Sequence, residues 1–367
     1  MNLELTDEQV ALRDTTRRFL AEKASIPDHV RPLLDDPTGT DDAVWHGLAG
    51  LGTTGLLVPE DHGGSGMTMV EAGIVAEELG AALHPGPWLS TAVAAPRTLN
   101  LLGANDTAAE LLRGIADGTT IAAVCFLDLE NASTAALVAA RSDDGTALQG
   151  EVTGVPDAAA ADVLLALADG ELVAVRNASP GVSVTAERGI DPTRKHFRVT
   201  FDAAPARRLG RVSAQQIAAV IDDVLIAGAA DALGAARAVM DLAVEYAKTR
   251  RQFGQPIGSF QAIQHLCVDM YETVELARSG VIHALWASDA APGTDERHLA
   301  ALRAKAFAGR LAAVADTAIQ VFGGIGYTWE HDAHLYLKRL LGWSAFLGGP
   351  DRYLTEIGAR LAKRGRH

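Results

Sequence analysis

Two segments in the second half of the sequence carry residue types that could bind an anionic ligand. In the first, residues 246–261, a predicted helix ends at glycine and proline, and Arg250 stands in its last turn. An arginine there can hold a phosphate through two parallel hydrogen bonds, and Phe253 could lie against an aromatic ring. The same arginine could instead be a cation that stabilises the negative end of the helix dipole. The residues alone favour this plainer interpretation.

The second segment, residues 320–327, reads Gln-Val-Phe-Gly-Gly-Ile-Gly-Tyr. Its glycines, Gly323 and Gly324, follow a predicted helix and would let the backbone approach a ligand closely. Glycines also simply end helices, so a GGxG pattern by itself is weak support for a binding site. Taken alone, this segment is more simply interpreted as a helix end.

Other reactive side chains support weaker hypotheses. His331 and His334 are three residues apart, as metal-binding pairs can be, but no third or fourth ligand is evident. A solvated or capping role is therefore favoured, and no metal site is expected. Cys125 and Cys267 are interpreted as core thiols, and His265 as a structural or interface histidine. Neither a GxxxxGK loop nor a GxGxxG turn after a strand is present, which argues against a nucleotidase or a Rossmann dehydrogenase.

The elements that would position these segments fall into three stretches. Residues 1–120 read as helices and loops, with predicted capping boxes at Thr6 and at Thr68, the second of which opens a helix over residues 69–79. Residues 121–210 read as a small β domain, because apolar and polar residues alternate over residues 197–202 and turn residues separate the strands. Residues 211–367 return to a helical period.

The C-terminal stretch predicts a helix bundle. One helix runs from Ser213 to about Arg250, and a second carries a continuous apolar stripe over residues 260–285. A third begins at Thr294, and a short fourth covers residues 334–341. Because the connections are short, the four helices should pack antiparallel. The predicted fold is α+β and mostly α: an N-terminal helical domain, a middle β domain and a C-terminal four-helix bundle.

Bulk composition restricts the classes of function. The 367 residues are 48% hydrophobic and 21% charged, and the net charge of -14 argues against general binding to nucleic acid or to an anionic membrane. The basic residues 363–367 are interpreted as a solvated tail. Two distant cysteines fit a reducing cytoplasm, and neither a signal peptide nor a run of about 18 apolar residues is seen. We expect a cytoplasmic protein.

Together, the segments resemble the acyl-CoA dehydrogenase family. The resemblance rests on residues 59–66, on residues 246–261 with the downstream His265 and Asp269-Met270, and on residues 320–327. Their order and spacing also match, as does the succession of helical, β and helical-bundle regions. The resemblance therefore covers essentially the whole chain.

The resemblance implies a flavoprotein of lipid or steroid breakdown. Family members oxidise acyl-CoA thioesters to 2-enoyl-CoA: FAD takes a hydride from Cβ, a carboxylate removes the α-proton, and electrons leave through an electron-transfer flavoprotein. In the family, the arginine of the first motif and the Gln and Gly-Gly of the second reach across a subunit interface to a neighbour's FAD. The matching FAD-binding residues are Arg250, Phe253, Gln320, Gly323 and Gly324.

The sequence departs from the family pattern where the catalytic base is expected. The family's usual glutamate lies in a loop after the last bundle helix, and Leu347 occupies that position here. In members that carry the glutamate in the first long bundle helix, the matching residues are 224–225, which include no acid. Two flavin-contacting segments of the middle domain are also missing, and the nearest stretches are residues 125–134 and 154–157. We expect no catalytic base in this chain.

Three hypotheses follow. The favoured one is a subunit that completes the FAD site of a homologous, catalytic partner, as in heteromeric acyl-CoA dehydrogenases common in actinobacterial steroid and lipid breakdown. The second is a homo-oligomer whose base is Asp222 or Asp223, which would need a burial-raised pKa; the plainer interpretation has both aspartates facing water. The third is a non-catalytic scaffold on the same fold, which would hold no flavin.

Overall fold

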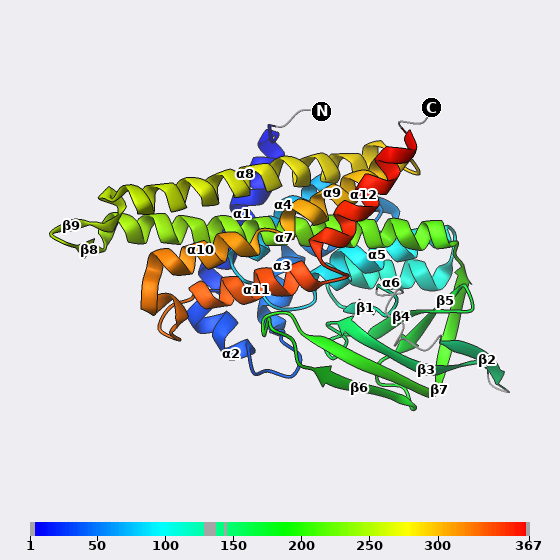
Figure 1. Ribbon diagram of the computed structural model, residues 1–367. Helices are drawn as coiled ribbons and strands as arrows, with labels where there is room; N and C mark the ends of the chain where they lie inside the picture. Colours follow the sequence, from blue (N-terminus) through cyan, green and yellow to red (C-terminus); the bar gives the residue numbers. More distant parts are fainter. Residues whose placement is uncertain (1–3, 128–136, 143–144, 365–367) are drawn as a thin grey trace. The chain divides into compact units, whose positions relative to one another are not determined.

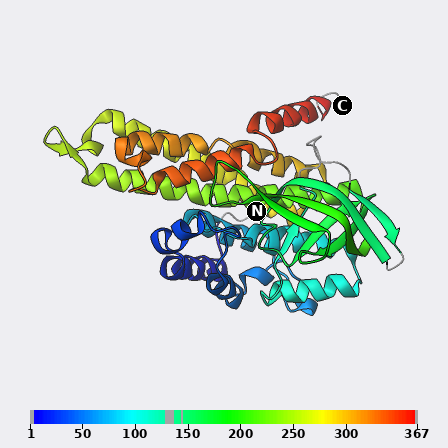
Figure 2. The same cartoon turned by 90° about the horizontal axis from the view of Figure 1, so that it is seen from below.

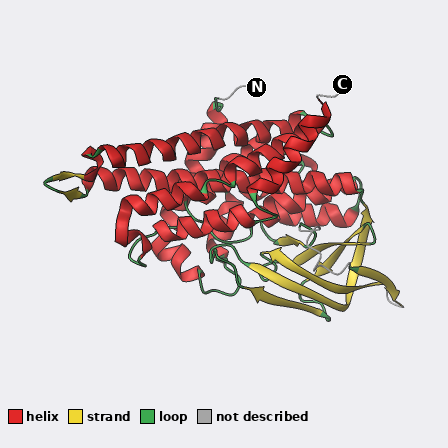
Figure 3. Cartoon of the chain, in the orientation of Figure 1, coloured by secondary structure: helices red, strands yellow, loops and turns green. Residues whose placement is uncertain are grey.

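The computed structural model describes residues 4–127, 137–142 and 145–364, and these are mostly helices with one large sheet (Figures 1 and 3). The chain divides into two compact units. One comprises Met1–Arg31, Gly73–His84 and Leu225–His367, and is called the bundle unit; the other comprises Pro32–Ala72 and Pro85–Val224, and is called the sheet unit. The three-domain division near residues 120 and 210 stays a prediction.

The sheet unit is built on seven strands in the order β1-β4-β5-β7-β3-β2, with β6 paired to β7. Only the β1–β4 pair is parallel among the described strands. The long β7 contacts three neighbours and holds the sheet together. The strands are β1 Ala122–Val124, β2 Val138–Ser142, β3 Gly145–Pro156, β4 Val163–Ala168, β5 Glu171–Arg176, β6 Val182–Glu187 and β7 His196–Arg211.

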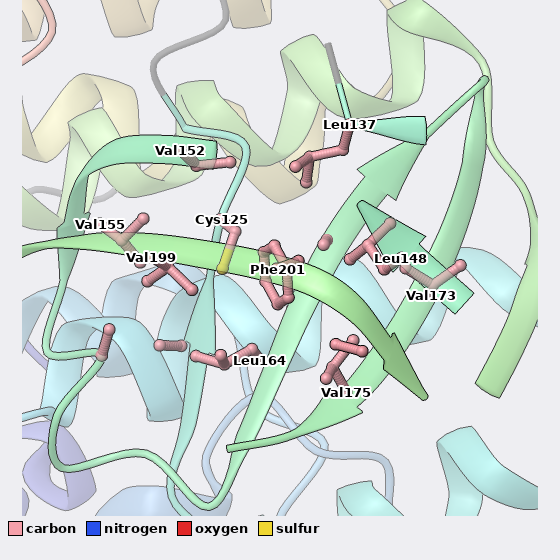
Figure 4. Packing of buried hydrophobic residues seen from close by; sticks show 14 of the residues in the cluster. Cys125, Leu137, Leu148, Val152, Val155, Leu164, Val173, Val175, Val199 and Phe201 are labelled. Carbon is pink, nitrogen blue, oxygen red and sulfur yellow. The ribbon is translucent and has the colours of Figure 1, made fainter. Parts of the chain in front are cut away.

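The alternation predicted for residues 197–202 is confirmed in β7. Phe197, Val199 and Phe201 are buried in the core of the sheet unit, whereas Arg198 is exposed on the other face. Figure 4 shows Phe201 among the buried residues of this core, with Leu164 of β4 and Cys125. Burial of one such phenylalanine contributes about 1.5–3 kcal/mol, so the alternation fixes which face of β7 turns inward.

Short helices complete the sheet unit. Asp41 caps α3 by accepting the Val44 N–H at 2.9 Å, and Asn105 caps α6 by accepting the Ala108 N–H at the same distance. These helices are α3 Asp42–Gly50, the π-helix Leu89–Ala94, α5 Ala95–Leu99 and α6 Asp106–Ala116. Single 3-10 turns lie at Thr53–Gly55, Glu60–His62 and Asn100–Leu102.

The bundle unit contains the long helices. The capping box predicted at Thr6 is present, since Thr6 and Gln9 exchange side-chain to backbone hydrogen bonds, and Thr68 pairs with Glu71 before α4. Helices α4 and α7 belong to this unit from Gly73 and from Leu225 onward. The helices are α1 Asp7–Lys23, α4 Met69–Ala81, α7 Ala214–Thr249, α8 Gln261–Ala290, α9 Asp295–Ala308, α10 Ala312–Phe322, α11 Ala333–Ala345 and α12 Pro350–Arg364, with a π-helix at Ile26–Val30. The short α2, Arg31–Leu33, spans the boundary between the two units in the chain.

Two details of the bundle differ from the prediction. The third predicted helix is two helices, α9 and α10, which are interrupted at Gly309; a Cβ there would lie 2.9 Å from the Lys305 carbonyl oxygen and 3.1 Å from Pro350. The interpretation of residues 363–367 as a tail is wrong for Lys363 and Arg364, because α12 extends to Arg364 and is anchored by the buried Tyr353.

Helices α4 and α7 make direct backbone contact. A Cβ added at Gly80 would clash with the Asp231 carbonyl oxygen, and one added at Gly234 would clash with the Glu77 carbonyl oxygen. Each helix therefore presents a glycine to the other's backbone. Close by, the buried Arg339 of α11 pairs with Asp231 at 3.0 Å and also donates to the His84 carbonyl at 3.1 Å. This pair is fully desolvated, so removal of either partner would be costly.

Candidate functional site

A small hairpin connects α7 to α8. Strands β8, Arg251–Gln252, and β9, Gln255–Pro256, pair antiparallel, and Figures 1 and 2 show this hairpin at the end of α7. Phe253 and Gly254 at its tip both have positive φ, 52° and 82°. This conformation suits Gly254 but is strained for a phenylalanine. The Phe253 side chain is 91% exposed, and its ring meets only the edge of Phe260 at 6.0 Å among the described aromatic contacts.

Arg250 ends α7 with its backbone fixed and its side chain exposed. Its N–H donates to the Tyr246 carbonyl and its carbonyl accepts the Ile257 N–H, both at 2.8 Å. The neighbouring cations are engaged: Lys248 pairs with Glu245, and Arg251 donates to the Gly254 carbonyl. No carboxylate of the described residues forms an ion pair with the Arg250 guanidinium. Its planar fork is thus available to an external anion.

The second predicted segment lies at the end of α10. Gln320 is exposed in the last turn, and Gly323 follows the helix with φ 68° and ψ -145°, a conformation that disfavours any residue with a Cβ. Its N–H donates to the Ile319 carbonyl. A Cβ at Gly323 or Gly324 would meet nothing within 4 Å, so the backbone here borders open space. The glycines therefore offer room for a ligand to approach.

The two segments come together at one end of the bundle unit. The ring of Tyr246, one turn before Arg250, packs against the ring of Phe322 with 5.1 Å between centroids, and Phe322 directly precedes Gly323. The ring of His331 contacts Phe322 from another side at 4.3 Å. This aromatic contact was not predicted from the sequence. One sequence signal was available: Tyr246 lies one helical turn from Arg250, and Phe322 lies in the same turn as Gln320.

Large apolar side chains are exposed around this end. Tyr327 is 67% exposed and Trp329 is 61% exposed, and both follow Gly323 in the chain. The Lys338 ammonium lies 4.8 Å from the Trp329 ring centroid, and the Arg31 guanidinium lies 5.9 Å from it. Exposed aromatic residues next to arginine are typical of surfaces that another molecule covers.

The position expected for a catalytic glutamate has no acid. Leu347 lies between α11 and α12 with φ 54°, followed by Gly348 with φ 102°. The Leu347 carbonyl accepts hydrogen bonds from the Tyr353 hydroxyl at 2.6 Å and from the Arg352 guanidinium at 3.3 Å. Residues 346–349, called the 346–349 segment, contain no titratable side chain. They cannot accept the α-proton of a substrate.

Asp222 and Asp223 are buried in the sheet unit. The interpretation that they face water is therefore wrong. The Asp223 carboxylate lies 3.3 Å from the Arg97 guanidinium, which stabilises its charged form in the low-dielectric interior. A carboxylate held in this way is a poor candidate for the base of the second hypothesis.

The remaining candidates have structural positions. His331 caps the start of α11, because its Nδ1 accepts the Ala333 N–H at 3.1 Å, whereas His334 is buried against the Trp329 ring and not solvated. Cys125 is a core thiol as predicted, and burial raises its pKa to about 12; Cys267 is only partly buried. Within the described ranges, no group of three or more His, Cys, Asp or Glu could hold a metal ion.

Two sequence-based expectations can be compared only with the residues that the structure describes. Residues 128–134, most of the 125–134 stretch that is nearest to a missing flavin-contacting segment, lie outside the described residues. In the ranges that the structure describes, no helix is long and apolar enough to cross a membrane.

Family models match most of the chain. The N-terminal domain model of acyl-CoA dehydrogenases matches residues 6–119, and the C-terminal domain model matches residues 225–362. The chain is 33% identical to acyl-CoA dehydrogenase IpdE2 of Mycobacterium tuberculosis over 97% of its own length and 98% of that protein. It is 36% identical to acyl-CoA dehydrogenase FadE34 of the same organism over 97% of its length, but spans only 48% of that protein.

Solved structures match over nearly the whole chain as well. The ChsE4–ChsE5 complex from Mycobacterium tuberculosis superposes with a TM-score of 0.88 at 27% identity, covering 99% of both chains. A steroid ACAD, Tcur3481–Tcur3483, superposes with a TM-score of 0.87 at 28% identity, covering 98% of this chain and 99% of that one. The helical and β regions predicted from the sequence agree with this fold.

Proposed function

This chain belongs to the acyl-CoA dehydrogenase family, whose members are FAD-dependent oxidoreductases that act on CH–CH groups, and from that premise we propose that it completes the FAD site of a homologous catalytic subunit. The observation that carries the proposal is a selective difference within the bundle unit. The exposed Arg250 keeps its guanidinium available for an anion, whereas Leu347 replaces the expected base. The chain thus retains a residue that could bind a cofactor and lacks a residue that could accept a proton.

The residues near the end of α7 fit the diphosphate end of FAD. Arg250 supplies a charge-assisted, bidentate donor, Gln320 an exposed amide, and Gly323 and Gly324 an unobstructed backbone. The exposed ring of Phe253 offers a surface for an aromatic group. When bound, FAD supplies the hydride acceptor of the reaction. The role of this chain is to bind and orient that cofactor, and the base that removes the α-proton comes from the partner.

A homologous partner subunit also accounts for the exposed apolar surface. In addition to Phe253, Tyr327 and Trp329, helix α8 exposes four large apolar side chains. A partner subunit that packed against them would remove them from water. The solved neighbours ChsE4–ChsE5 and Tcur3481–Tcur3483 are complexes of two proteins. The α8 residues are Val268, Tyr271, Leu276 and Trp286.

The substrate in this proposal is an acyl-CoA, and a steroid-derived acyl group fits the resemblance to a steroid ACAD. An electron-transfer flavoprotein would then reoxidise the flavin. A bulky acyl group would be shared between two subunits more easily than enclosed by one. The test is the rate of flavin bleaching by steroid-derived and straight-chain acyl-CoA thioesters in the purified complex; equal rates would argue against a steroid preference.

The first test is the visible absorbance of the protein, purified alone and after co-expression with any homologous subunit that is encoded beside it. We expect a colourless chain alone and a yellow complex with one flavin for each pair of chains. A chain that alone carries one flavin and is bleached by an acyl-CoA would overturn the proposal and favour the homo-oligomer, with Asp222 and Asp223 as the residues to substitute. A complex that holds no flavin would favour the scaffold hypothesis.

A further inference from the structure

Lys305 of α9 is a fully buried lysine, and no carboxylate of the described residues pairs with it. Burial lowers its pKa from 10.5 to about 7, and no acidic side chain among those residues opposes that shift. Its amine donates to the Trp343 carbonyl and lies 3.4 Å from the Ser344 carbonyl. It also lies 3.8 Å from the centroid of the Trp343 ring. A buried amine is normally paired with an acid, so this arrangement calls for a different explanation.

The two carbonyls that Lys305 approaches belong to the last turn of α11. The final carbonyls of a helix have no partner within the helix, and a buried helix end needs donors from elsewhere. After this turn the chain reverses: the Phe346 N–H donates back to the Gly342 carbonyl at 3.0 Å, and the Gly348 N–H donates to the Ala345 carbonyl at 3.1 Å. Lys305 therefore supports the base of the 346–349 segment.

Helix α12 holds the same segment from its other side. Tyr353 and Arg352 both donate to the Leu347 carbonyl, and the Tyr353 ring centroid lies 6.0 Å from the Lys305 amine. In α12, Tyr353 is the titratable group near the amine, and Arg352 shares its hydrogen bond to Leu347; the contacts of the amine with α11, among the described residues, are two carbonyls and the indole of Trp343. Side chains of α12 thus hold the carbonyl of Leu347, which has a left-handed conformation, and Lys305 of α9 holds the end of α11 that precedes it.

We propose that Lys305 is a positioning residue, which locks the 346–349 segment by donating to the end of α11, and that opening of this segment releases the amine to solvent. The relevance of the segment to a substrate rests on the proposed function, because it stands where the family's catalytic glutamate is expected. The lock itself does not depend on flavin, acyl-CoA or a partner. The experiment on this lock can therefore succeed or fail whether or not the proposed function is correct.

The proposal has a defined pH signature. If the closed segment holds a lysine of depressed pKa and the open segment exposes an ordinary one, opening takes up a proton between about pH 7 and 10.5. Opening must then become rarer as the pH rises through this window, and must not change with pH below it. A lysine that stays buried during opening would give no such dependence.

The test is amide hydrogen exchange of Phe346 and Gly348 in the purified full chain at pH 6 to 9, with rates corrected for the intrinsic pH dependence of exchange. In the native protein we expect protection to be constant from pH 6 to 7 and to rise at least fivefold from pH 7 to 9. In Lys305→Met, protection should be independent of pH and at least fivefold lower at pH 9, because two buried carbonyls lose their donor.

Two further variants keep the test decisive if Lys305→Met does not fold. Lys305→Arg retains a donor that stays charged throughout, so its protection should not vary with pH. Lys338→Met removes a partly buried cation of α11 that contacts Trp329 and not the 346–349 segment, and should leave the native profile unchanged. A native profile that is flat from pH 6 to 9, or one that persists in Lys305→Arg, would overturn the proposal.

Discussion

Two regions of the bundle unit have opposite characters. The end of α7 and α10 is exposed and open, with Arg250 available to an anion and glycines that border empty space. The 346–349 segment has no reactive side chain, but its backbone is held by hydrogen bonds. Lys305 donates on one side, and Tyr353 and Arg352 donate on the other. A site that serves another subunit must face outward, whereas a segment that has no base needs only to keep its shape. Under the proposed function, this difference corresponds to a division of labour between subunits.

The largest effect expected from this comparison is the loss of flavin in Arg250→Ala. One charge-assisted pair contributes about 1.5–3 kcal/mol, so the dissociation constant of FAD from the complex should rise roughly 10- to 100-fold. Flavin content after gel filtration and fluorescence titration of the apo-complex measure this. Arg250→Lys should be intermediate because it keeps the charge without the fork.

The matched control is Lys248→Ala in the same helix turn, since Lys248 is an exposed cation that already pairs with Glu245. Its FAD affinity should stay within twofold of the native complex. If both variants lose flavin equally, the effect is one of general charge, and the role assigned to Arg250 is wrong.

The next effect separates the two glycines. Gly323 has a backbone conformation that costs a residue with a Cβ about 1–3 kcal/mol, whereas Gly324 has no positive φ. Thermal unfolding should show Gly323→Ala to be clearly destabilised and Gly324→Ala to be close to the native protein. Both leave room for the added methyl group. Equal melting temperatures would show that the turn after α10 relaxes without cost.

A smaller effect is expected at the closed region. Tyr353→Phe removes the hydroxyl that donates to the Leu347 carbonyl at 2.6 Å, and one such bond contributes about 0.5–1.5 kcal/mol. Urea unfolding should report that loss, while the flavin content of the complex stays unchanged. Loss of flavin in this variant would link the two regions and remove the distinction between them.

For the last variant, we expect no measurable change in activity. Leu347→Glu places an acid at the position where the family resemblance predicts the base, but the sequence also departs from the family pattern at the flavin-contacting segments of the middle domain. Acyl-CoA-dependent reduction of a dye by the chain alone should therefore stay at background. Measurable turnover would show that the base was the only missing component, and the proposed dependence on a partner would have to be abandoned.

The sequence predicted local features better than distant contacts. The caps at Thr6 and Thr68, the alternation in β7 and the helix end at Arg250 all follow from neighbouring residues, and all are present. The burial of Asp223 was missed because its partner Arg97 lies far away in the chain. The contact of Tyr246 with Phe322 was missed for the same reason.

Two helix boundaries were missed for local reasons. The break between α9 and α10 had a signal, Gly309, in an otherwise helical pattern, but glycine is often tolerated there. Helix α12 was overlooked because the basic residues at its end resemble a tail, although Glu356 and Arg360 are spaced for a helical ion pair and form one at 2.8 Å. The family resemblance, rather than periodicity, indicated which residues to assign to FAD.

The paired glycines at the crossing of α4 and α7 have a consequence for how this protein could change over time. Because Gly80 and Gly234 bring main chain against main chain, the crossing is specified by the lack of side chains and not by any particular set of them. In a library of single substitutions, these two positions should tolerate almost nothing, while Leu347 accepts many replacements. A scaffold fixed in this way can lose or acquire reactive groups elsewhere without losing its shape.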